Sequence, residues 1–153
     1  RALKGITAEE ALRRVEPMNS IGWMVGHLAW QEQRYWLTQG QGITLVKSVN
    51  KMGYGEPAST PPLNEMWEAW HTITAAADPW LDKLTSADLE TFSLNSKGNP
   101  YSESIGTRLR RTTYHYWFHI GESQAIRQLL GHGKLPTFVG DISGKAHYIP
   151  ETD

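Results

Sequence analysis

Residues 63–84, which read LNEMWEAWHTITAAADPWLDKL, carry a regular helical pattern. Their apolar side chains recur at alternating steps of three and four residues, at Leu63, Met66, Trp70, Ile73, Ala77, Trp80 and Leu84. This spacing places them on one face of an α-helix, which is then buried against other elements. Pro79 lies inside the pattern and predicts a kink or an early end, because proline removes one helical hydrogen bond.

Two further helices are predicted, one on each side of this stretch. The first follows Ser20, a suitable N-cap residue, and runs from Ile21 to about Thr38. The other follows Ser102, a second N-cap candidate, and extends to Leu130, where Gly131 supplies a stop signal. Three helices with apolar faces favour an all-α fold in which they pack as an antiparallel bundle.

The N-terminal residues indicate that the bundle has a further helix. Thr7 and Glu10 form a capping-box pattern that begins a turn running through Leu12 to Glu16, and residues 1–6 resemble the end of a preceding helix. The simplest interpretation is that a first helix lies mostly before Arg1. We therefore predict a single domain over residues 1–153, a four-helix bundle whose first helix is largely missing from this chain.

The connections and the C-terminal tail are less regular. Segments 40–62 and 91–102 are rich in Gly, Pro, Ser and Asn; residues 43–46 suggest a short strand or a packed loop, and residues 92–94 a second extended segment. The tail 131–153 is too apolar to remain free, so we expect it to pack over a helix face or another subunit. A homodimer is accordingly expected.

Composition excludes several classes of function. The 15 Lys and Arg residues nearly balance the 16 Asp and Glu residues, which argues against a nucleic-acid or polybasic membrane surface. No apolar run is long enough to span a bilayer, and no signal-peptide pattern is present, so a cytoplasmic protein is expected. The chain has no cysteine, so any metal must be held by His, Asp or Glu.

Three of the six histidines form a candidate metal site. His115 and His119 are four residues apart, so both imidazoles lie on one helix face, about one turn from each other. His27 lies on the first predicted helix between Trp23 and Trp30. A lone histidine on such a face is more often a core residue, but three that project inward suit a metal, and three neutral ligands leave positions open for water and substrate.

Several other polar and aromatic residues have either a role at this site or an ordinary structural role. Glu122 and Arg34 lie near the histidine faces. Each either contacts a metal-binding histidine or the substrate, or is an ordinary solvated charge on its helix. Trp23, Gln31 and Arg34 are predicted to form a substrate pocket opposite Glu122. No site role is expected for the other histidines or for a short basic cluster predicted to be solvated: His71, His132, His147, Arg108, Arg110 and Arg111.

Four segments together resemble the DinB-like superfamily. They are residues 19–28 (NSIGWMVGHL), the His115-x-x-x-His119 pair with 120–122 (IGE), residues 125–131 (AIRQLLG) and residues 135–142 (LPTFVGDI). The resemblance implies a four-helix bundle with a long crossover after the second helix, in agreement with segment 40–62. It also implies a metal triad at His27, His115 and His119 that binds a divalent metal such as nickel or zinc.

The resemblance also suggests an activity. Characterised relatives are metal-dependent enzymes that use low-molecular-weight thiols such as bacillithiol or mycothiol, whereas many others have no known activity. We therefore expect a metal-dependent transferase that joins a small thiol to a small electrophilic substrate. A metal-dependent hydrolase, a non-catalytic metal- or ligand-binding stress protein, and a bundle in which the histidines only pack remain alternatives.

Overall fold

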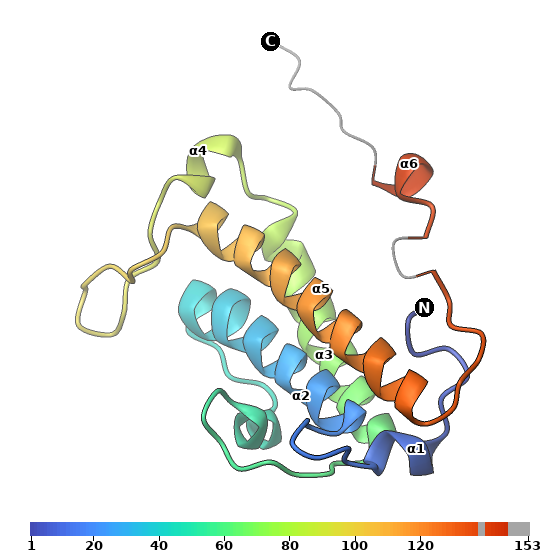
Figure 1. Cartoon of the computed structure of the whole chain (residues 1–153). Helices are drawn as coiled ribbons and strands as arrows, with labels where there is room; N and C mark the ends of the chain where they lie inside the picture. Colours follow the sequence, from blue (N-terminus) through green and yellow to red (C-terminus); the bar gives the residue numbers. More distant parts are fainter. Residues whose placement is uncertain (138–139, 147–153) are drawn as a thin grey trace.

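The computed structural model describes residues 1–137 and 140–146. Three long helical stretches lie side by side in it (Figure 1): α2 (Ile21–Glu32), which continues directly as the π-helical η1 (Gln33–Gln39), α3 (Leu63–Leu81) and α5 (Ile105–Leu129). The short helices are α1 (Ala8–Leu12), the 3-10 helix η2 (Lys47–Met52), α4 (Ser86–Leu89) and α6 (Ile142–Lys145). No strand occurs in these residues, which confirms the all-α prediction; the additional helix expected before Arg1 stays a prediction.

The predicted helix starts are confirmed in two cases and wrong in one. Ser20 Oγ accepts a hydrogen bond from the Trp23 N–H at 3.2 Å and so caps α2. The capping box of Thr7 and Glu10 is complete, although α1 ends at Leu12 and not at Glu16. The N-cap of α5 is Ser104, not Ser102. The first residue of α5 is tied to the beginning of the connection, because the Ile105 N–H donates a hydrogen bond to the Thr91 carbonyl at 2.9 Å.

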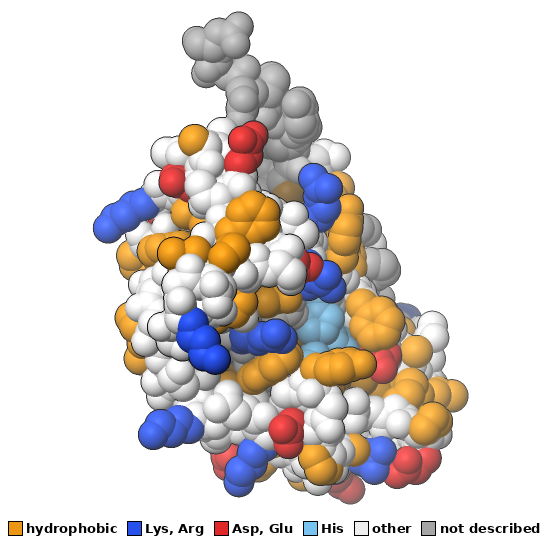
Figure 2. Space-filling model, turned by 90° about the vertical axis from the view of Figure 1, so that its left-hand side faces the viewer, with side chains coloured by type: hydrophobic (Ala, Val, Ile, Leu, Met, Phe, Trp, Pro, Cys, Tyr) orange, Lys and Arg blue, Asp and Glu red, His pale blue; other side chains and the backbone are white. Residues whose placement is uncertain are grey.

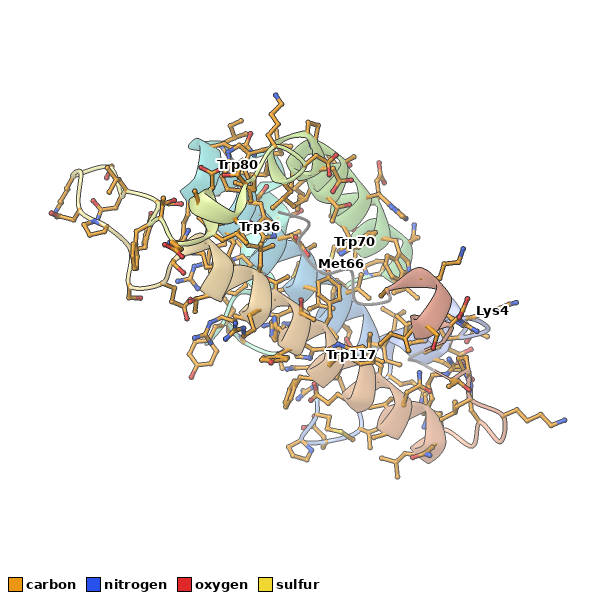
Figure 3. All side chains as sticks on the ribbon, turned by 90° about the horizontal axis from the view of Figure 1, so that it is seen from above. Lys4, Trp36, Met66, Trp70, Trp80 and Trp117 are labelled. Atoms are coloured by element: carbon orange, nitrogen blue, oxygen red, sulfur yellow. The ribbon has the colours of Figure 1, made fainter. Side chains whose placement is uncertain are left out.

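The core lies between α2, α3 and α5. The predicted stripe of α3 is confirmed at Met66, Ile73 and Ala77, all of them buried. Figure 3 shows Trp36 and Trp80 next to each other at one end of the bundle, with ring centroids 6.3 Å apart. The helix ends at Leu81, two residues after Pro79 and three before the end of the sequence pattern, so the proline shortens it as predicted.

Segment 40–62, which contains η2, is attached to the bundle through the buried side chain of Gln33. Gln33 Oε1 accepts hydrogen bonds from the Leu45 and Val46 N–H groups at 2.9 and 2.7 Å, and its Nε2–H donates to the Val46 carbonyl at 3.0 Å. The Gln33 amide thus supplies bonds that a neighbouring strand would otherwise supply. Residues 43–46 therefore form the predicted packed loop and not a strand. In the other connection, the expected extended segment 92–94 contributes a single isolated β-bridge, between Leu94 and Pro100.

Two glycines on α2 allow this segment to approach closely. A Cβ atom on Gly22 would collide with the carbonyl oxygen of Pro61. One on Gly26 would lie 2.5 Å from Met66 Sδ and 3.0 Å from Met52 Cε. The middle of the crossover, at Met52, and its end, at Pro61, therefore rest directly on the α2 backbone, and this contact fixes where Met52 meets the helix.

The tail lies only partly within the described residues. Residues 140–146, which contain α6, border a groove together with Thr113, Trp117 and Ile120 of α5. The predicted packing of residues 138–139 and 147–153, including His147, falls outside the part of the chain that the structure describes. Within that part, no helix has the combination of length and hydropathy needed to cross a bilayer.

Candidate metal centre

Three histidine side chains converge between α2 and α5. These helices run antiparallel beside each other (Figure 1), so the middle of one faces the middle of the other. His27 comes from α2, and His115 and His119 come from successive turns of α5. One nitrogen of each ring lies within 4.8 Å of the others. The Nε2 atoms of His115 and His119 are 2.9 Å apart, near enough for both to bind one ion at about 2.0–2.1 Å.

Hydrogen bonds on the far side of two rings orient them. The His27 Nδ1 lies 2.5 Å from the Met52 carbonyl oxygen, which can only accept, so Nδ1 carries the proton and Nε2 presents a lone pair. The His119 Nδ1–H donates to Glu122 Oε2 at 2.8 Å, so its Nε2 again presents a lone pair. A histidine held in this way by a carbonyl or a carboxylate is the usual arrangement of a metal ligand. The His115 Nδ1 is buried without a hydrogen-bond partner.

All three imidazoles are held in the neutral form. Burial lowers the pKa of His27 against the opposing effect of the Met52 carbonyl. Burial also lowers the pKa of His115 to about 4 and that of His119 to about 3, with a further contribution from the neighbouring histidines. Neutral imidazoles retain the lone pairs that a cation needs. The three residues can therefore hold one divalent ion near neutral pH.

Two indoles fix the plane of the His27 ring. Trp23, one turn earlier on α2, stacks on it with ring centroids 4.7 Å apart and planes at 12°, and Trp30, one turn later, stacks at 5.2 Å and 23°. His27 itself is buried. Trp117, in contrast, lies at the surface of α5 and borders the groove beside α6 (Figure 3).

Two cavities are each lined by at least two of the three histidines, and a third, of about 200 Å³, is lined by His119 alone of the three. The larger, of about 620 Å³, is lined by His27 and His115 together with Gln31 and Arg34. Figure 2 shows this region as a hollow in which the pale blue histidine surface is bordered by hydrophobic and basic side chains. The smaller, of about 420 Å³, is lined by Trp23 and Glu122. The predicted pocket is thus divided: Gln31 and Arg34 share one cavity, whereas Trp23 lies with Glu122 and not opposite it.

A sequence model of the DinB superfamily matches residues 1–123, a stretch that includes His27, His115, His119 and Glu122. The chain belongs to the DinB superfamily. A search of the curated proteins finds no match. The resemblance in residues 125–131 and 135–142 lies beyond the matched stretch, so the family assignment rests on the part of the chain that carries the histidines.

Sequence analysis missed several residues that line the larger cavity of this DinB superfamily protein. They include Tyr54 from the crossover, and Arg110, Arg111, Tyr114 and Phe118 from α5. Arg111 precedes His115 by four residues, so the same helical spacing that joined the two histidines would have placed it on their face. Tyr54 offers no such signal, because it lies in an irregular loop.

Arg108 corrects the prediction of a solvated basic cluster. Its side chain is only 1% exposed, and its Nη1–H donates to Ser93 Oγ at 3.1 Å. Its guanidinium lies over the ring of Tyr101 at 4.9 Å. Ser93 and Tyr101 belong to the connection before α5, which folds back over the first turns of that helix. Arg110 and Arg111 are exposed as predicted, but they border the cavity.

The other described histidines of this DinB superfamily protein lie outside the metal centre. His132 accepts a hydrogen bond from the Arg127 Nε–H at 3.3 Å and donates one from Nε2 to Glu10 Oε1 at 2.9 Å. It thereby ties the end of α5 to α1. His71 contacts the rings of Trp67 and Trp70 on α3.

Proposed function

We propose that this protein binds one divalent ion, zinc or nickel, through His27, His115 and His119, and that it is a metal-dependent transferase. The substrates are a low-molecular-weight thiol and a small electrophile. The observation that carries the proposal is the convergence of three neutral imidazoles, two of which present an Nε2 lone pair because Nδ1 carries the proton. Three imidazoles suit zinc and nickel alike.

The bound ion would supply Lewis acidity, which lowers the pKa of a thiol or of water and so provides a nucleophile near neutral pH. Three neutral ligands leave the full charge of the ion available for this purpose. Because the chain has no cysteine, the thiol must come from a small molecule. Family resemblance favours a thiol over water as the nucleophile.

Residues around the triad have supporting roles in this proposal. Glu122 holds the proton on the His119 Nδ1 and thereby fixes the tautomer that binds metal. Trp23 and Trp30 keep the His27 ring in one plane. The larger cavity provides room for the electrophile beside His27 and His115.

Metal content tests the first half of the proposal. Protein purified without chelators or a nickel column should contain one equivalent of metal by elemental analysis. The variant with both His115→Ala and His119→Ala should contain none, and His27→Ala should bind orders of magnitude more weakly. His71→Ala, an exposed histidine outside the triad, serves as the control and should keep its metal. A triple variant lacking all three histidines that still held one equivalent would refute the assignment.

Turnover tests the second half. Metal-loaded protein and the His115→Ala variant are assayed with chlorodinitrobenzene and epoxides, each with bacillithiol, mycothiol, glutathione or no thiol. We expect turnover that requires both metal and thiol. Metal-dependent turnover without thiol would indicate a hydrolase instead. Equal rates for the two proteins would contradict a metal-dependent reaction of either kind.

A further inference from the structure

The larger cavity is lined by positive charge without any carboxylate. Arg34, Arg110 and Arg111 line it, and its lining includes no Asp or Glu. Arg111 is paired with Glu103. Arg34 and Arg110 have no ion pair among the described residues, and the Arg34 guanidinium lies over the rings of Trp30 and Tyr35 at 5.3 and 5.7 Å. Two arginines are therefore free to bind an anion at this wall.

The remaining walls of the cavity are mostly aromatic. Trp30, Tyr35, Tyr114 and Phe118 line it, and its volume of about 620 Å³ is that of a small-molecule site. Such walls favour a flat, apolar ligand body. The cavity thus combines an apolar chamber with a basic wall.

A buried amide gives the cavity a further polar contact. Gln31 is 5% exposed and lines the cavity, and its Oε1 has no hydrogen-bond partner. A buried acceptor without a partner carries a cost that a ligand donor would relieve. Gln31 lies between His27 and Arg34 along the continuous helical stretch of α2 and η1, four residues after the first and three before the second. It therefore contacts the middle of any ligand that spans from the histidines to the arginines.

Helix geometry sets the length of such a ligand. Arg34, in η1, is seven residues beyond His27 of α2, a rise of about 10 Å, and Arg110 is five residues from His115 along α5, a rise of about 7.5 Å. Because α2 and α5 run antiparallel, both steps lead toward the same end of the bundle. The basic wall therefore lies one to two helical turns from the candidate metal centre.

We propose that this cavity binds a flat, apolar compound with one oxyanion group, a carboxylate or a phosphate, which Arg34 and Arg110 hold while the uncharged end faces His27 and His115. This inference names the substrate class of the same site, so it rests on the proposed function. It concerns the arginines and not the ion, and binding to metal-free protein therefore tests it separately.

Calorimetric titration with three matched probes provides the test. Naphthalene-2-carboxylate and 2-naphthyl phosphate carry the anion, and naphthalene-2-carboxamide is the neutral counterpart. Each is titrated into chelator-treated and metal-loaded wild type, into the double variant Arg34→Gln/Arg110→Gln, and into Arg13→Gln. Arg13 is exposed and lines none of the cavities described here, so it controls for the loss of one positive charge.

In chelator-treated wild type we expect at least one anion to bind about tenfold or more tightly than the amide, a difference of about 1.4 kcal/mol or more, because a hydrogen bond to a charged group is stronger than one to a neutral group. The double variant should lose this preference and still bind the amide. The control variant Arg13→Gln should keep the preference for the anion. The tighter of the two anions identifies the oxyanion. The proposal would be overturned if the three probes bound equally, or if none bound at millimolar concentration. It would also be overturned by a preference for the anions that survives in the double variant, or by one seen only with metal. The comparison in chelator-treated protein does not depend on whether the histidines bind metal.

Discussion

At the residue scale, the hydrogen bond between His119 and Glu122 gives a direct prediction. The Glu122 carboxylate fixes the proton on Nδ1 and keeps Nε2 available. Glu122→Ala should therefore weaken metal binding by about ten- to a hundredfold, the usual effect of losing the group that orients a ligand. Competition with a chromogenic chelator measures the affinity.

Glu122→Gln is the matched control for this change. Its amide oxygen can accept the same hydrogen bond, so most of the affinity should return. If Glu122→Ala bound metal as tightly as the wild type, the carboxylate would have no orienting role.

Glu10 gives a prediction about pH. Its carboxylate accepts hydrogen bonds from the Thr7 backbone N–H, the larger effect, and from His132, which together lower its pKa from 4.5 to about 2. Because the folded pKa is the lower one, the unfolded chain binds this proton first as the pH falls. The contribution of Glu10 to stability is therefore complete above pH 4.5 and is lost progressively toward pH 2.

Glu10→Gln should flatten this dependence. Urea unfolding at several pH values between 4.5 and 2 should show the free energy of unfolding falling less steeply in the variant than in the wild type. Glu9→Gln, a change at a neighbouring carboxylate that does not make the hydrogen bonds of Glu10 to Thr7 and His132, should leave the wild-type slope intact. Parallel curves for Glu10→Gln and the wild type would contradict the interpretation.

At the scale of the elements, the contact between α2 and the crossover predicts an asymmetry between two glycines. Gly22→Ala should destabilise the protein by about 1–3 kcal/mol, because the added Cβ meets the Pro61 carbonyl, which cannot rotate away as a side chain does. Gly121→Ala, on α5, meets nothing within 4 Å and should be neutral or stabilising by up to about 1 kcal/mol. Thermal unfolding compares the two. A tolerated Gly22→Ala would mean that the crossover does not rest on α2.

The helices could be predicted because each carries its own periodic signal. Met66, Ile73 and Ala77 reveal the buried face of α3 by spacing alone, and His115 and His119 reveal their shared face in the same way. What could not be predicted depends on partners distant in sequence. Arg108 is buried because the connection folds over it, and Gln33 is buried because its amide meets the crossover backbone. Neither residue differs locally from a solvated one.

The candidate site likewise has a part that could be predicted from helical spacing and a part that could not. The three histidines and Glu122 lie on two helices whose faces spacing reveals, so their convergence follows once the helices pack. The acceptor for the His27 proton is the backbone carbonyl of Met52. Every residue has such a carbonyl, so the residue type at position 52 could not predict this hydrogen bond. The division of the pocket into two cavities depends on Tyr54 and the loop that carries it, which no periodic pattern describes.

At the scale of the whole molecule, exposed apolar side chains support the expectation of a homodimer. Tyr114, Phe118 and Leu129 of α5 are each 65% exposed, and Ile142 of α6 is 49% exposed. Surface concentrations of such residues commonly mark contacts with other chains. We therefore predict that sedimentation velocity at micromolar concentration yields a dimer. A stable monomer under those conditions would exclude it.

The hydrogen bond from His27 to the crossover backbone has a consequence for how the protein can vary. Every amino acid at position 52 offers the same carbonyl oxygen, so point mutations there alter packing but never delete the acceptor. Insertions or deletions between residues 40 and 62, in contrast, would slide a different peptide group past the imidazole. Amino-acid substitutions in this loop are therefore compatible with an intact metal centre. A change in the length of the loop, in contrast, alters the hydrogen bond that orients His27.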